Sequence, residues 1–251
     1  MRLTVAVGLL AVAAAVALIA ALGSGGRTAH ARHVRRTPAP RRRTAVVRLG
    51  RSVRGRPINA VHIGNARRAD LLVVGCIHGN EPAGIAVTRL LRGTLARRRV
   101  DAWLIDDLNP DGRAADTRVN GRGVDLNRNF PWRWRRLFTR GDPQYGGPRA
   151  LSEPESRAAA RLIGRVRPRV SVWFHQPLAL VDKSGGSAGV ERRFSRLAGM
   201  PLRRLTRYPG SAVGWEDHVL RDSTAFVVEL PPGRLSGRAA ARLARSVAAL
   251  I

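Results

Sequence analysis

The segment Leu71-Leu72-Val73-Val74-Gly75-Cys76-Ile77-His78-Gly79-Asn80-Glu81-Pro82 decides the fold, because an apolar run ends abruptly at a histidine and then a glutamate. The run has the length and β-branched content of a buried strand, and Pro82 is acceptable in the first turn of a helix. His78 and Glu81 therefore flank a predicted strand-to-helix turn, where both side chains can face one point. Imidazole and carboxylate are good zinc ligands, and a catalytic zinc site needs three protein ligands. A third ligand is expected downstream.

Length, charge and cysteine content narrow the protein class. With 251 residues and 44% hydrophobic content, the chain can form one domain with a substantial core. Cys76 is the single cysteine, which excludes intrachain disulfides and favours a packed core thiol. The net charge is +28, but all 45 Lys and Arg residues except Lys183 are arginine, which indicates a chain-wide bias. No nucleic-acid-binding motif accompanies the charge, so no specific nucleic-acid partner is expected.

The N-terminal region predicts export or attachment to a membrane. An uncharged apolar run follows Arg2, so residues 1–22 are predicted to be a signal peptide or a membrane anchor. Residues 23–43 are rich in Gly, Pro, Thr and Arg and are predicted to be a disordered tether. We therefore expect an exported protein, extracellular or membrane-anchored at the cell envelope. Arginines after the apolar run leave a cytoplasmic-side orientation open, under the positive-inside rule.

The remaining residues, 44–251, are predicted to form one α/β domain. A hairpin is expected over residues 46–64, and strands then alternate with helices, which favours a mainly parallel mixed sheet flanked by helices. Further strands are expected at residues 71–77, 102–105, 170–174 and 225–228, and helices at residues 82–95, 152–163 and 236–251, with Ile85, Leu90, Leu91 and Leu95 on the buried face of the first. Residues 106–112 are predicted to be a turn from their Asn-Pro and Asp-Gly chemistry.

The strand pattern repeats in a way that brings polar residues together. The predicted strands at residues 170–174 and 225–228 run directly into His175 and Glu229, as the first strand leads to His78. Ligands of α/β folds bind at the carboxyl ends of parallel strands. The three side chains are therefore expected at one edge of the sheet.

Five ordered motifs resemble a known family. The loop Asn120-Gly121-Arg122-Gly123-Val124-Asp125-Leu126-Asn127-Arg128-Asn129-Phe130-Pro131 is too polar for a core element. Together with His78-Gly79-Asn80-Glu81, Asn109-Pro110-Asp111-Gly112, Trp173-Phe174-His175 and Phe226-Val227-Val228-Glu229-Leu230, it resembles the zinc carboxypeptidases of the carboxypeptidase A type. Within that family the resemblance is strongest to the small bacterial murein peptide amidases. These enzymes cleave the bond between γ-D-glutamate and diaminopimelate in cell-wall peptides.

The resemblance implies one zinc ion per chain, bound by His78, Glu81 and His175, with Glu229 as general base. Zinc lowers the pKa of its bound water towards ~7 and polarises the amide carbonyl. Glu229 follows a buried run as a carboxylate without a sequence partner, so it can accept the proton of the water and pass it to the leaving amine.

The resemblance also implies the residues that bind the substrate. Asn127 and Arg128 are expected to hold the terminal carboxylate, because an arginine fork binds a carboxylate through paired, charge-assisted hydrogen bonds. Arg118 is expected beside the scissile carbonyl, where a single oxyanion donor is typically worth ~3–4 kcal/mol. Tyr208 is the candidate for the family's mobile tyrosine. Lys183 is more consistent with a solvated loop charge than with a substrate contact.

Three functions remain open at this point. The leading prediction is a zinc-dependent hydrolase that cleaves an amide bond next to a free carboxylate, acting on a peptide derived from the cell wall. An N-acyl-amino-acid deacylase of the aspartoacylase type shares a His-Gly-Asn-Glu start and a similar Asn-Arg loop. The third is a non-catalytic cationic cell-wall binding protein.

Overall fold

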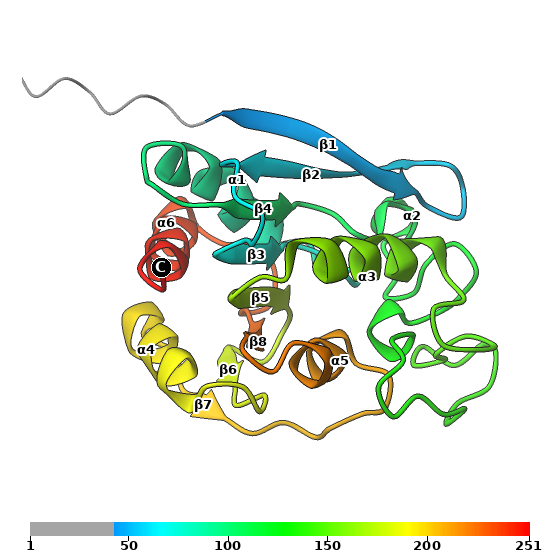
Figure 1. Cartoon of the computed structure of the whole chain (residues 1–251). Coiled ribbons are helices and arrows are strands. Elements are labelled where there is room, and N and C mark those ends of the chain that lie inside the picture. Colours follow the sequence, from blue (N-terminus) through cyan, green and yellow to red (C-terminus); the bar gives the residue numbers. More distant parts are fainter. Residues whose placement is uncertain (1–42) are drawn as a thin grey trace, which may run out of the picture. The chain divides into compact units, whose positions relative to one another are not determined.

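The predicted hairpin forms one edge of a mixed eight-stranded sheet (Figure 1). The computed structural model describes residues 43–251, so the signal or anchor predicted at residues 1–22 and all but the last residue of the tether predicted at residues 23–43 lie outside the described residues. Strands β1 (Thr44–Arg51) and β2 (Pro57–Ile63) pair antiparallel, and β2 continues antiparallel onto β4 (Ala102–Ile105). The predicted hairpin is thus confirmed.

The centre of the sheet is parallel and largely buried. Strand β3 (Leu71–Val74) lies between β4 and β5 (Val170–His175), and β5 pairs in parallel with β8 (Thr224–Glu229). Apolar side chains cover both faces of these strands, which is why they read as continuous apolar runs. The second edge is formed by β6 (Leu180–Asp182), antiparallel to β8, and the two-residue β7 (Leu202–Arg203).

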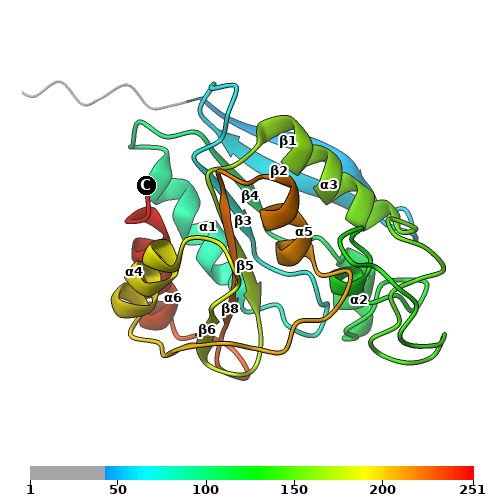
Figure 2. The same cartoon turned by 60° about the horizontal axis from the view of Figure 1, so that its bottom comes forward.

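Helices cover both faces of the sheet (Figure 2). Helices α1 (Gly84–Leu95), α4 (Ala188–Ala198) and α6 (Gly237–Ala248) pack on one face, and α3 (Pro154–Val166) and α5 (Ala212–Val219) pack on the other. Each of these helices is amphipathic and packs its apolar side against the sheet, as α6 does with Leu243 and Val247. The result is the three-layer α/β architecture that the alternation of strands and helices predicts.

Two local predictions are corrected by the structure. Leu90 is 44% exposed, and Val87 and Thr88 occupy the buried face of α1 instead. The predicted turn at residues 106–112 contains the start of α2 (Pro110–Ala115), because the Asn109 side chain accepts a hydrogen bond from the Gly112 N–H and Pro110 suits the first helical position.

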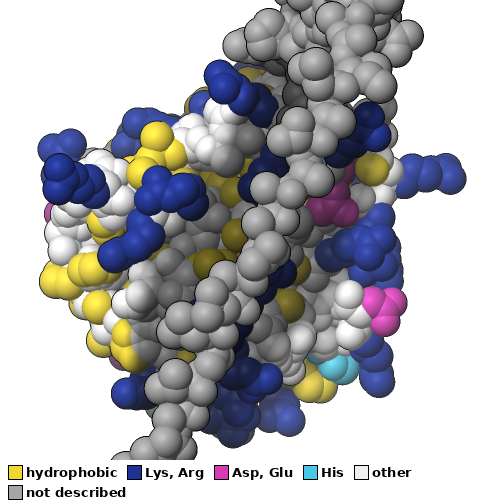
Figure 3. Space-filling view, turned by 90° about the vertical axis from the view of Figure 1, so that its left-hand side faces the viewer, with side chains coloured by type: hydrophobic (Ala, Val, Ile, Leu, Met, Phe, Trp, Pro, Cys, Tyr) yellow, Lys and Arg dark blue, Asp and Glu magenta, His cyan; other side chains and the backbone are white. Residues whose placement is uncertain are grey.

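Basic side chains are distributed over the surface of the described residues. On the face shown in Figure 3, Lys and Arg side chains are spread among other residues, with few acidic groups between them. This distribution agrees with a compositional bias.

Within residues 43–251, no helix combines the length and the apolar character needed to cross a bilayer.

Candidate metal centre and active site

Two strands and one turn bring the predicted ligands to a common point. His78 lies in the turn that follows β3, Glu81 lies in the same turn before α1, and His175 is the last residue of β5. The turn packs tightly against α2: a Cβ on Gly79 would lie 1.9 Å from the Gly112 carbonyl carbon. Only glycine fits there, so the sequence His-Gly fixes the position of the histidine.

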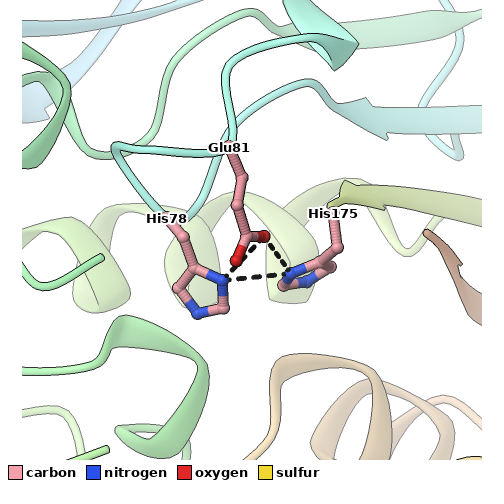
Figure 4. Close-up of side chains that lie close together, drawn as sticks. All are labelled: His78, Glu81 and His175. Atoms are coloured by element: carbon pink, nitrogen blue, oxygen red, sulfur yellow. Dashed lines mark hydrogen bonds and ion pairs between the residues drawn. The ribbon is translucent and has the colours of Figure 1, made fainter. Parts of the chain in front are cut away.

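The three ligand atoms converge as a metal centre requires (Figure 4). Glu81 Oε2 lies 3.0 Å from the Nδ1 atoms of both His78 and His175, and these two nitrogens are 3.1 Å apart. All three side chains are buried. Two imidazole nitrogens and a carboxylate oxygen that face one another at this distance form a donor set that suits one divalent cation, and their chemistry fits zinc.

Asp125 orients the first of these ligands. The fully buried Asp125 accepts a hydrogen bond from His78 Nε2 at 2.9 Å, which leaves the Nδ1 lone pair facing the centre. Its Oδ2 also accepts from Arg118 Nε at 3.0 Å. The sequence alone predicts no role for Asp125. The signal that could have pointed to it is its position in the Asp125-Leu126-Asn127-Arg128 loop.

Burial and neighbouring charges set the protonation of the ligands. Burial lowers the pKa of His175, which favours the neutral imidazole. Burial also acts to lower the pKa of His78, but the carboxylates of Asp125 and Glu81 outweigh it and raise this pKa. For Glu81, burial is outweighed by both histidines, which hold its pKa well below the usual range. A negative carboxylate among imidazoles is therefore ready for a cation.

Glu229 stands beside the centre at the end of the neighbouring strand. It is the register partner of His175 in the β5–β8 pair. Its Oε2 is buried and has no hydrogen-bond partner among the described residues. Burial, followed by the charge of Glu81, raises the pKa of Glu229 to about 7. A carboxyl group with a free oxygen and a pKa near neutrality has the properties of a general base.

The structure places Arg118 and Arg128 on the wall of the same cavity. Arg118 Nη1 donates to Glu81 Oε1 at 3.0 Å, so its guanidinium lies directly against a predicted zinc ligand. Arg128 Nη1 donates to the Asn127 carbonyl at 2.8 Å, and its guanidinium carbon lies 4.3 Å from the ring centroid of Tyr208. The buried Nε of Arg128 has no partner among the described residues. An unpaired donor in this position can bind a carboxylate.

The cavity that contains these groups has a volume of about 300 Å³. All eight residues predicted from the sequence line it: His78, Glu81, Arg118, Asn127, Arg128, His175, Tyr208 and Glu229. Lys183 is exposed and does not line it. Gln176, which sequence reasoning missed, also lines the cavity and donates its backbone N–H to Glu81 Oε2 at 3.1 Å. The strands alone could not reveal this contact, since it depends on the turn after β5.

A mixed α/β sheet with a His, Glu and His centre beside a free carboxylate defines a class of metal-dependent hydrolase. Comparison with known proteins identifies the family. The model of the zinc carboxypeptidase family matches residues 36–181, more than half of the chain. This match includes His78, Glu81 and His175 and ends before Glu229. The chain therefore belongs to the zinc carboxypeptidase family and is a zinc-dependent hydrolase.

Individual relatives agree with this placement. The chain is 33% identical over 179 residues to murein peptide amidase A of Escherichia coli (strain K12), which covers 66% of this chain and 74% of the relative. It is 31% identical over 196 residues to murein peptide amidase A of Vibrio campbellii, with 73% and 78% covered. The crystal structure of the murein-tripeptide amidase of Escherichia coli O157 superposes with a TM-score of 0.65 at 27% identity, over 82% of this chain and 91% of that one. Carboxypeptidase A of Helicoverpa armigera shares the fold, with a TM-score of 0.69 at 19% identity over 82% and 69%.

Proposed function

We propose that the protein is a murein peptide amidase that cleaves the amide bond between γ-D-glutamate and diaminopimelate in peptides derived from the cell wall. The observation that carries the proposal is the buried His78, Glu81 and His175 centre next to Glu229, in a chain similar to two murein peptide amidases. The arrangement supplies metal binding, a proton acceptor and a carboxylate site within one cavity. A non-catalytic wall-binding protein needs none of these.

The residues of the site have separate roles in hydrolysis. Arg128, with Asn127 beside it, binds the free α-carboxylate of the residue on the leaving side, which fixes the scissile bond over the metal centre. His78, Glu81 and His175 would hold the zinc ion, which would lower the pKa of a water molecule and polarise the carbonyl. Glu229 Oε2 accepts the proton of the attacking water and passes it to the leaving amine.

Arg118 is proposed to stabilise the developing oxyanion. Its guanidinium already lies 3.0 Å from Glu81 Oε1, and Asp125 fixes its orientation from behind. A donor held in place before the reaction stabilises charge without a cost of reorganisation. Tyr208, 37% exposed and stacked over Arg128, is proposed to cover the bound substrate.

We also propose that the enzyme acts outside the cytoplasm, at the cell envelope, where cell-wall peptides are found. The uncharged apolar run before residue 23 supports this proposal by its sequence, as a signal peptide or an anchor. Expression of the full chain in a bacterial host, followed by fractionation of envelope, medium and cytoplasm, tests it. Recovery of all the protein in the cytoplasm would contradict export.

The catalytic proposal is tested with three substrates offered to the zinc-loaded protein: L-Ala-γ-D-Glu-diaminopimelate, an ordinary peptide with a free C-terminus, and an acetylated amino acid. We expect cleavage of the first at the γ-D-Glu bond, and no turnover by Glu229→Gln, which retains the shape of the side chain but cannot accept the proton. Cleavage of the acetylated amino acid alone would identify a deacylase instead. Full activity of Glu229→Gln would contradict the assignment of the base.

A further inference from the structure

The active-site cavity continues past Glu229 to a second polar pair, Asp182 and Arg207. Strand β6 pairs antiparallel with β8 so that Leu180 lies opposite Glu229. Because alternate residues of a strand face the same side, Leu180 and Asp182 share the face of Glu229. Asp182 is therefore displaced by two residues, about 7 Å along the strand, from the level of the catalytic carboxylate. Asp182 and Arg207 both line the cavity.

The two side chains form an ion pair that is held from several sides. Arg207 Nη1 donates to Asp182 Oδ2, and the Leu205 backbone N–H donates to Asp182 Oδ1 at 2.9 Å. The Asp182 side chain is 4% exposed, whereas that of Arg207 is 42% exposed. Arg207 Nη2 also donates to the Lys183 carbonyl oxygen. The carboxylate is thus fixed in the cavity wall, while the exposed part of the Arg207 side chain can still meet a ligand.

A second carboxylate, that of Glu191, interacts with Asp182. Glu191 is fully buried and accepts the Ser184 N–H at 2.8 Å, next to Asp182 in the chain. Its Oε2 is buried without a hydrogen-bond partner in the described part of the chain. Burial raises the pKa of Glu191, and the charge of Asp182 raises it further. Of these two carboxylates Asp182 lines the cavity, where it can accept hydrogen bonds from a ligand group that brings a positive charge.

No other function of the site uses this pair. Among the cavity-lining residues that the structure describes, the remaining charged side chains are the zinc ligands, Glu229, Arg118 and Arg128. These groups bind the metal, the proton, the oxyanion and the α-carboxylate. Asp182 and Arg207 are left, and they offer a carboxylate and a guanidinium side by side. That combination complements an ammonium and a carboxylate carried on one carbon atom.

We propose that Asp182 and Arg207 form the specificity site for the far end of the substrate side chain, and that they select a diamino-dicarboxylic residue over a residue with one terminal charge. The inference rests on the proposed amidase function and names the determinants of its specificity. In diaminopimelate the distal carbon lies four bonds from the α-carbon, about 5 Å by standard bond lengths, and its charged groups lie beyond it. This reach matches the two-residue offset of Asp182 from Glu229.

The test compares kcat/KM for four peptides, L-Ala-γ-D-Glu-X, where X is meso-diaminopimelate, lysine, 2-aminopimelate or norleucine. The distal group carries both charges in the first, an ammonium in the second, a carboxylate in the third and neither in the last. We expect the wild type to prefer meso-diaminopimelate over each of the others by at least about 10-fold, as two charged contacts predict.

Two variants separate the two contacts. Asp182→Asn keeps an oxygen for the Leu205 N–H and should lower kcat/KM by about 10- to 100-fold for the two peptides with an ammonium, relative to norleucine in the same preparation. Arg207→Gln should do the same for the two peptides with a distal carboxylate. Arg204→Gln, which removes an exposed arginine three positions away that does not line this cavity, is the matched control and should leave all ratios unchanged.

The outcomes distinguish this inference from the function on which it rests. If the wild type cleaves all four peptides equally, or if either variant lowers all four by one factor, the amidase function stands and the specificity site is refuted. If the wild type cleaves none of them, the proposed function fails and the inference fails with it. Ratios taken within one preparation are insensitive to partial unfolding of a variant.

Discussion

Replacement of Asp125 by asparagine tests how the loop between α2 and α3 supports the metal centre. The Asp125 carboxylate accepts hydrogen bonds from His78 Nε2 at 2.9 Å and from Arg118 Nε at 3.0 Å. Asparagine has one acceptor oxygen and one donor amide. In either orientation of the amide, an NH₂ group meets a donor of His78 or Arg118, and the negative charge is lost.

The expected loss of zinc affinity follows from these contacts. Replacing a carboxylate that orients a metal-bound histidine typically lowers metal affinity or activity by 10- to 100-fold. At 1.36 kcal/mol for each factor of ten, this corresponds to about 1.4–2.7 kcal/mol of binding free energy. We expect Asp125→Asn to weaken zinc binding within this range and to lower kcat/KM, while the zinc-saturated protein stays folded.

The assay is a competition titration of zinc against a chromogenic chelator, with thermal unfolding measured in parallel. Asp101→Asn is the matched control, because Asp101 is also buried and contacts an imidazole, His62 Nε2, at 3.1 Å, in a hydrogen bond between neighbouring strands away from the centre. Its zinc affinity should equal that of the wild type. Equal losses in Asp101→Asn and Asp125→Asn, or wild-type affinity in Asp125→Asn, would refute the role assigned to Asp125.

Three further predictions concern the base, the carboxylate site and the core. Glu229 must be ionised to accept a proton, and burial raises its pKa to about 7 while zinc would counteract this shift. The log kcat/KM of the wild type should therefore rise with pH along an acidic limb below about pH 7, and a kcat/KM that stays constant from pH 5 to 8 contradicts this. Arg128→Lys removes the fork and the stacking on Tyr208 and should lower kcat/KM by about 10- to 100-fold, mainly through KM, with a wild-type profile as the contrary result. Burial raises the pKa of Glu216 from 4.5 to about 7. The protonated form therefore contributes its full stabilisation below pH 4.5, and this contribution is lost as the pH rises to about 7. The free energy of unfolding should change by about 3 kcal/mol. Glu216→Gln should remove this dependence in unfolding experiments from pH 5 to 8, because an amide can pair with both Ser171 and Trp173; an unchanged slope contradicts it.

The parts of the fold that sequence reasoning predicted are those with strong apolar patterns. The four residues of β3 are all buried, as the run Leu71–Val74 indicates. Strand β5 is also buried throughout, and four of the six residues of β8 are buried. Helix α4 was missed, although Val190, Phe194 and Ala198 have helical spacing, because charged residues outnumber apolar ones between them. Strands β6 and β7 have too few residues for any periodicity to emerge.

Some residues of the candidate site could likewise be predicted from the sequence, and others could not. His175 and Glu229 could be placed because parallel strands in register bring their carboxyl ends together. The roles of Asp125 and Gln176 could not be predicted, because they depend on the path of a loop and of a turn. Neither path produces a periodic pattern in the sequence. The sequence assigns no role to Asp182, which directly precedes Lys183. Its role depends on the pairing of β6 with β8.

The central claim is that His78, Glu81 and His175 hold one zinc ion beside Glu229. Its most direct test is elemental analysis of the full-length wild type, Glu229→Gln and His175→Ala after exposure to zinc and removal of the excess. We predict one zinc per chain in the wild type and in Glu229→Gln, and a large loss of zinc in His175→Ala. A wild type without zinc, or a His175→Ala variant that retains a full equivalent, would contradict the account.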